Sequence, residues 1–130
     1  MATPFAVEQI RIARKAIAQA REGYATSALR TLGLLNDRYW LGEAVTTIVG
    51  GLTDRRDHVE VGDFLALVEG YDKAHAEWAV ISTMIGQIRD KHDLDQVEYR
   101  LREFISQYDG KDWDLVKWAK VLKIRLEANE

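Results

Sequence analysis

The chain has 130 residues, of which 47% are hydrophobic, and this size and composition are typical of one folded domain covering residues 1–130 rather than of a disordered polypeptide. Cysteine is absent, which excludes a disulfide framework and thiolate chemistry. The formal net charge of −3 is unevenly distributed: residues 41–115 carry eight Lys/Arg and sixteen Asp/Glu, whereas residues 1–40 carry six and three, and the last fifteen carry four and two.

The first predicted helix runs from Pro4 to Arg21. Thr3 can cap it, proline is favoured in a first helical turn, and Gly23 ends it. Charged residues interrupt its apolar stretch, which argues against a secretory signal. No apolar run in the chain approaches the ~20 residues that span a bilayer. We therefore expect a soluble, cytoplasmic protein that does not bind membranes.

Six further helices are predicted, because apolar residues recur at helical spacing and strand-like alternation is absent. Gly, Asn and Asp clusters separate them. The expected helices cover 24–35, 38–52 and 58–70, followed by one that Asp72 caps and that ends near Lys91, one that Asp93 caps and that ends before Asp109, and a last one that Asp112 caps. The fifth, around Trp78, is broadly apolar, which predicts a central position with neighbours on more than one side.

A 36-residue step relates five sets of apolar positions. The sets are Ala25, Val61 and Val97; Leu29, Leu65 and Leu101; Leu32, Val68 and Phe104; Ala44, Val80 and Val116; and Leu52, Ile88 and Ile124. Such a period is typical of helical hairpins in series. Hairpins of similar length in an irregular bundle are the alternative, because nearly half of all residues are apolar.

One junction between helices is similar to a known repeat. The segment 23–29, GYATSAL, is similar to the helix–turn–helix junction of tetratricopeptide repeats. The resemblance covers this junction alone, because Phe64 and Arg100 stand where later units would need a small residue, and no proline ends a unit. We therefore predict an all-α domain of about seven short antiparallel helices, either a stack of helical hairpins, tetratricopeptide-like at most, or an irregular bundle.

Two histidines form the pattern closest to a catalytic motif. His58 lies 34 residues before His92 and Asp93, and with Asp114 as a last ligand this is similar to the His…His-Asp…Asp pattern of metal-dependent phosphohydrolases. The resemblance implies a helical hydrolase with a metal at these residues. Because the His-Asp pair lies in the polar turn RDKHD, a solvated helix boundary is favoured. Phosphate-loop and serine-nucleophile motifs are also absent, so we expect neither an enzyme nor a cofactor or metal.

A basic cluster on the first helix, Arg11, Arg14 and Lys15, suggests an alternative function. A basic helix can follow phosphates, as in an accessory factor that associates with nucleic acid. The acidic remainder of the chain opposes this reading, so we expect a protein partner instead, with these basic residues speeding its association.

The tryptophans supply the other candidates. Trp78 fits a core stripe, whereas Trp40, Trp113 and Trp118 are candidate interface residues. The last helix is apolar around most of its circumference, which predicts either insertion into the bundle or a subunit interface, such as a homodimer. We expect a non-catalytic protein–protein interaction module, an adaptor, accessory subunit or regulator, that docks partners on exposed apolar and aromatic helix faces.

Overall fold

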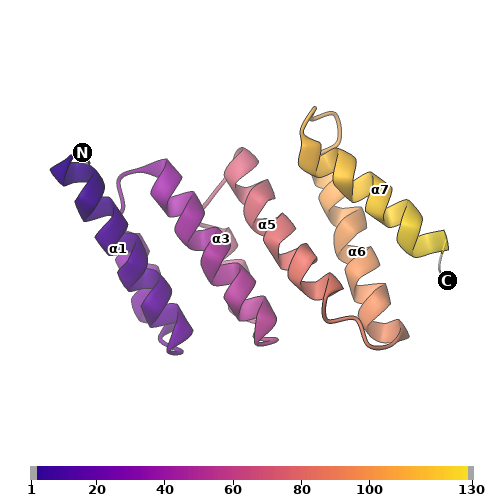
Figure 1. The fold of residues 1–130 in the computed structure, drawn as a ribbon, viewed down its shortest axis with the longest axis horizontal. Helices are drawn as coiled ribbons and strands as arrows, with labels where there is room; N and C mark the ends of the chain where they lie inside the picture. The colour runs from indigo at the N-terminus through magenta and orange to yellow at the C-terminus, as the bar shows by residue number, and fades with distance from the viewer. Residues whose placement is uncertain (1–2, 129–130) are drawn as a thin grey trace.

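Seven α-helices make up the fold in a computed structural model that describes residues 3–128 (Figure 1). They are α1 (Pro4–Arg21), α2 (Ala25–Leu32), α3 (Arg38–Asp54), α4 (Val61–Leu65), α5 (Gly70–Ile85), α6 (Lys91–Gln107) and α7 (Asp114–Ala128). No strand occurs within residues 3–128. The all-α prediction is therefore confirmed. No helix in this range is both long and apolar enough to cross a membrane.

The helices pack as neighbouring pairs that follow one another along a stack. α1 packs on α2 and α3, α3 on α4 and α5, and α6 on α5 and α7. Figure 1 shows α1, α3 and α5 side by side in this order, with the two ends of the chain at opposite ends of the stack. The prediction of a central fifth helix is confirmed, because α5 contacts α3, α4, α6 and α7.

The 36-residue step relates helices of the same kind. It leads from α2 to α4 and α6, and from α3 to α5 and α7, except that Val68 and Ile88 lie just beyond the ends of α4 and α5. Every position in the five sets is buried or half-buried except Ile124, which is 66% exposed. Ile124 lies on α7, and no further helix among the described residues covers that side of it.

Two groups of buried side chains form the core, and α5 contributes to both. The first group fills the space between α1 and α5, where Phe64 is its largest fully buried side chain. The second lies among α5, α6 and α7 around Phe104. Val80 of α5 belongs to the first group and Ile81 to the second, so two different sides of this helix join the two halves of the core.

The buried stripe of α1 contains a polar side chain among alanines. α1 buries Gln9, Ala13, Ala16 and Ala20. Gln9 is only 2% exposed, and its Oε1 accepts hydrogen bonds from the backbone N–H groups of Asn36 and Asp37 at 2.9 and 3.0 Å. Since Asp37 caps α3, Gln9 ties the first hairpin to the start of the next one.

Helix boundaries are where the sequence prediction fails most often. The helix predicted over 58–70 is reduced to the five residues of α4. The predicted cap Asp72 is wrong, since α5 already begins at Gly70, whose φ is +60°. Glycine adopts such a conformation at little cost. As a result Tyr71, expected in a loop, lies on α5.

The starts of α6 and α7 also differ from prediction. Asp90, not Asp93, caps α6, and its carboxylate accepts the Asp93 N–H at 2.9 Å. The Asp93 carboxylate in turn accepts the Arg89 N–H at 3.1 Å, a reciprocal arrangement like a capping box. α7 begins at Asp114, and Asp112 instead forms a 3.0 Å ion pair with Lys117.

Candidate functional site

Six aromatic side chains from α5, α6, α7 and the α6–α7 connection form one cluster of ring contacts. This aromatic cluster comprises Tyr71, Trp78, Phe104, Tyr108, Trp113 and Trp118, and neighbouring ring centroids are 5.0 to 6.4 Å apart. Aromatic pairs at these distances attract each other beyond the effect of area burial alone. The cluster therefore fixes the position of α7 relative to α5.

The cluster has a buried interior and an exposed border. Phe104 on α6 and Tyr108, the residue that directly follows this helix, are 2% and 6% exposed. Trp113, just before α7, is half-buried and meets Tyr71 edge to face at 5.2 Å. Tyr71 and Trp118 are 50% and 54% exposed. Half of each of these two rings is therefore held in place by packing while the other half faces water.

Tyr108, a member of the cluster, forms a polar pair with Glu77 of α5. The Tyr108 hydroxyl donates a hydrogen bond to Glu77 Oε2 at 3.3 Å. Burial raises the pKa of Glu77 above its usual value, although the charge of Lys73, this hydrogen bond and the charge of Arg100 partly oppose the shift. Burial and the nearby Glu77 carboxylate raise the pKa of Tyr108. The fold thus stabilises the neutral forms of both groups, as expected for partly desolvated sites.

The outer face of α7 carries an apolar stripe among charged side chains. The stripe consists of Trp118, Val121 and Ile124, which are 54%, 51% and 66% exposed. The opposite side of the same helix is buried against α5 and α6 through Leu115, Val116 and Ala119. The helix carries four basic and two acidic side chains, so the stripe lies in a basic surrounding. Lys117 and Lys123 have acidic partners, Asp112 and Glu127, at 3.0 and 2.7 Å.

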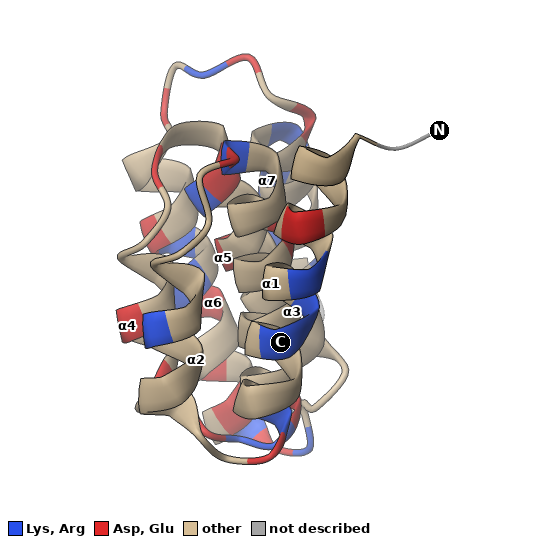
Figure 2. Ribbon diagram, turned by 90° about the vertical axis from the view of Figure 1, so that its left-hand side faces the viewer, with Lys and Arg blue, Asp and Glu red and all other residues tan. Residues whose placement is uncertain are grey.

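The remaining predicted interface residues lie elsewhere in the stack. Trp40 is half-buried near the start of α3, in edge contact with Tyr39 at 5.1 Å. Arg11, Arg14 and Lys15 are exposed on α1, and Arg11 is paired with Glu8. Figure 2 shows basic residues along one side of α1. The structure thus brings Trp113 and Trp118 together, but it leaves Trp40 and the basic side chains of α1 apart from them.

Two tyrosines that the sequence did not single out extend the aromatic surface toward α3. A hollow of about 210 Å³ between α3 and α5 has Tyr39 and Tyr71 in its wall. Tyr39 is 62% exposed. His75 also lines the hollow, at stacking distance from Tyr71 and within 3.3 Å of the Thr46 hydroxyl. Exposed aromatic side chains therefore continue across α3, α5 and α7.

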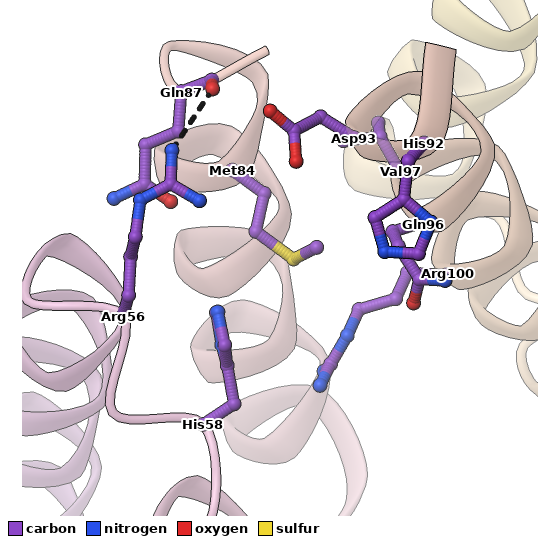
Figure 3. A pocket seen from close by; sticks show the side chains of 9 residues that line it. All are labelled: Arg56, His58, Met84, Gln87, His92, Asp93, Gln96, Val97 and Arg100. Carbon is purple, nitrogen blue, oxygen red and sulfur yellow. Dashed lines mark hydrogen bonds between the residues drawn. The ribbon is translucent and has the colours of Figure 1, made fainter. Parts of the chain in front are cut away.

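The residues of the metal-site resemblance meet in a second place. His58, His92 and Asp93 line one cavity of about 370 Å³ (Figure 3), and Asp114 is not part of its wall. Within residues 3–128, no three His, Cys, Asp or Glu side chains are grouped closely enough to hold a metal ion. The 34-residue spacing of the histidines therefore places them at one cavity without forming a ligand set.

Comparison of the chain with known protein families, with curated proteins and with solved structures finds no match in any of the three. Function has to be argued from the surfaces themselves, since a fold alone does not determine it. Two surfaces stand out: the aromatic cluster with the outer face of α7, and the cavity between His58 and His92.

Proposed function

We propose that the protein is a non-catalytic docking module that binds a segment of another protein on the outer face of α7 and the exposed border of the aromatic cluster. The observation that carries this proposal is the exposure of Trp118, Val121 and Ile124, at 54%, 51% and 66%. α7 is the last helix within residues 3–128, and no helix in that range covers this stripe. An apolar stripe at that position is accounted for by a partner that covers it.

The charges around the stripe indicate the chemistry of the partner. α7 carries Lys117, Lys120, Lys123 and Arg125 against Asp114 and Glu127. Two copies of α7 facing each other would bring these basic residues together, and like charges across an interface cost affinity. The other end of the stack, α1, is also basic in its exposed residues. These charges favour an acidic, amphipathic helix from a different protein over a second copy of this chain.

The spacing of the stripe supports a helical partner. Residues 118, 121 and 124 follow each other at three-residue steps, and such rows form the ridges along which helices pack. Trp118 is already positioned by contact with Trp78, at a centroid distance of 6.4 Å. A pre-positioned aromatic ring loses little side-chain freedom on binding, so Trp118 is the expected hot spot, worth about 2 kcal/mol or more.

The test compares two exposed aromatic residues on adjacent helices. Trp118→Ala removes the proposed hot spot, and Tyr99→Ala removes a side chain that is 57% exposed on α6 and belongs to neither the stripe nor the cluster. Wild-type protein and both variants are used as bait in parallel, and the recovered partner is then purified for titration. We expect Trp118→Ala to weaken binding about 30-fold or more, and Tyr99→Ala to have little effect. A third variant, Lys120→Glu, should also weaken binding at low salt.

Equal loss of binding in Trp118→Ala and Tyr99→Ala would contradict the proposed surface. Analytical ultracentrifugation of wild type and Trp118→Ala then measures whether the stripe mediates self-association. A wild-type dimer that Trp118→Ala converts to a monomer would assign the stripe to self-association and overturn the proposal of a separate acidic partner. A monomer at all concentrations agrees with that partner.

A further inference from the structure

The cavity between His58 and His92 is lined by two arginines in addition to the two histidines that the sequence pattern contains. It lies where the α3–α4 connection, the end of α5 and the first turns of α6 meet. Arg56, His58, His92 and Arg100 all line it, and among residues 3–128 Asp93 is the one carboxylate in its wall. Figure 3 shows His58 and Arg100 facing each other across the cavity, with Arg56 on the side of the α3–α4 connection. We propose that this cavity binds the phosphoryl group of a small organic phosphomonoester.

One hydrogen bond orients the Arg56 side chain, and two more hold the residue that accepts it. The guanidinium Nη2 of Arg56 donates to the Gln87 carbonyl oxygen at 3.2 Å. The Gln87 side chain reaches back in the opposite direction, since its Nε2 donates to the Thr53 and Asp54 carbonyl oxygens at 2.9 and 3.0 Å. These bonds join the end of α3 to the end of α5. The wall of the cavity is therefore organised before a ligand arrives, which lowers the entropic cost of binding.

The two arginines of the cavity outnumber the one carboxylate found in its wall among the described residues, so the wall keeps an excess of positive charge. Within residues 3–128, no ion pair joins Arg56 or Arg100 to an acidic side chain. Asp93 is engaged in capping, because it accepts the Arg89 N–H at 3.1 Å. Burial raises the pKa of Glu77 and the charge of Arg100 partly opposes this rise, but the two side chains form no ion pair. The N–H groups of Arg100 are therefore available to a ligand. Two guanidinium groups suit a phosphate, whose oxygens can accept paired N–H bonds.

The other walls indicate that the phosphate carries an organic group. Met84 and Val97 provide apolar surface in the same cavity. Its volume of about 370 Å³ lies within the range of sites for small molecules, roughly 300–1,000 Å³. Inorganic phosphate would leave most of this space filled with water. A phosphomonoester with a compact apolar or aromatic group uses both the charged and the apolar walls.

The experiment is a titration of the full chain followed by amide and side-chain NMR. The probes are phenyl phosphate, methyl phosphate and, as an uncharged control, benzyl alcohol. We expect saturable shifts at His58, Gln87 and His92 with phenyl phosphate, weaker binding of methyl phosphate and none of benzyl alcohol. Arg100→Gln should weaken phenyl phosphate about tenfold or more, because it removes hydrogen bonds between charged groups.

Two further variants keep the test decisive if one side chain proves necessary for folding. Arg56→Gly suits the positive φ of 60° at this position and removes the guanidinium, so we expect about the same loss of affinity as in Arg100→Gln. Arg102→Gln, two residues further along α6 and outside the cavity wall, should bind like wild type. Absence of saturable shifts, or equal losses in Arg100→Gln and Arg102→Gln, would overturn the proposal. Binding of a phosphoserine peptide without binding of phenyl phosphate would also refute the small-molecule assignment.

Discussion

Replacing Gln9 by Met would show how strongly one buried amide holds the first two hairpins together. Met has nearly the same length and fills the same space, but it cannot accept the N–H groups of Asn36 and Asp37, which now lie 2.9 and 3.0 Å from Gln9 Oε1. A buried donor without an acceptor costs about 1–3 kcal/mol. Because water can reach these two groups partly, the lower end applies to each, and we expect unfolding free energy to fall by about 2 kcal/mol.

Gln19→Met is the matched control, since it is the same change on the same helix. Gln19 accepts one hydrogen bond, from the Thr31 hydroxyl at 2.6 Å, and leaves no backbone group unsatisfied when it is removed. Its expected cost is about 1 kcal/mol or less. Urea unfolding followed by circular dichroism measures both variants. Equal stability of Gln9→Met and wild type, or a larger loss in Gln19→Met, would refute the role assigned to Gln9.

Two further substitutions test the packing beneath the proposed docking surface and the short helix α4. The pKa of Glu77 is raised from 4.5 in the fold, so its stabilising contribution is complete below the pKa of the unfolded chain and is lost as pH rises through the higher folded value. Glu77→Gln never ionises and can still accept the Tyr108 hydrogen bond, so it should be more stable than wild type at neutral pH but not in acid; urea unfolding at both pH values decides. Phe64→Ala removes a side chain with no exposure and should cost about 3–5 kcal/mol in the same assay; a loss below about 1 kcal/mol would show that α4 contributes little to the core.

Periodicity predicted the long helices well because their buried residues also follow helical spacing. The limits of α1 agree at both ends, since Thr3 accepts the Ala6 N–H at 3.1 Å and Gly23 has a φ of +92°. α4 shows where prediction from the spacing of apolar residues fails. Phe64 and Val68 recur at helical spacing and are both buried, but α4 ends at Leu65. Val68 reaches the core from an irregular segment, so tertiary burial and not helix formation explains its apolar character.

The aromatic residues were only partly predictable for a related reason. The sequence makes Trp113 and Trp118 candidate interface residues, and both belong to the aromatic cluster. Their difference in exposure depends on how α7 lies on α5 and α6, which no local pattern contains. Tyr71 was missed because its helix was expected to begin after it. The sequence contained a signal at Gly70, but a glycine two residues before an aspartate also fits a loop that leads to an Asp cap.

The polar cavity shows how residues that match a metal-site pattern in the sequence can meet in a helical stack without forming a metal site. In a stack of hairpins, connections separated by one hairpin lie at the same edge of the molecule, so polar residues about one period apart become neighbours. His58 and His92 are separated by 34 residues, close to the 36-residue step of the core, and both line one cavity with Arg56 and Arg100. The spacing of hairpins therefore accounts for the two histidines lining the same cavity. The pair of arginines in that wall is the basis of the phosphoryl site proposed above, because guanidinium groups attract phosphate.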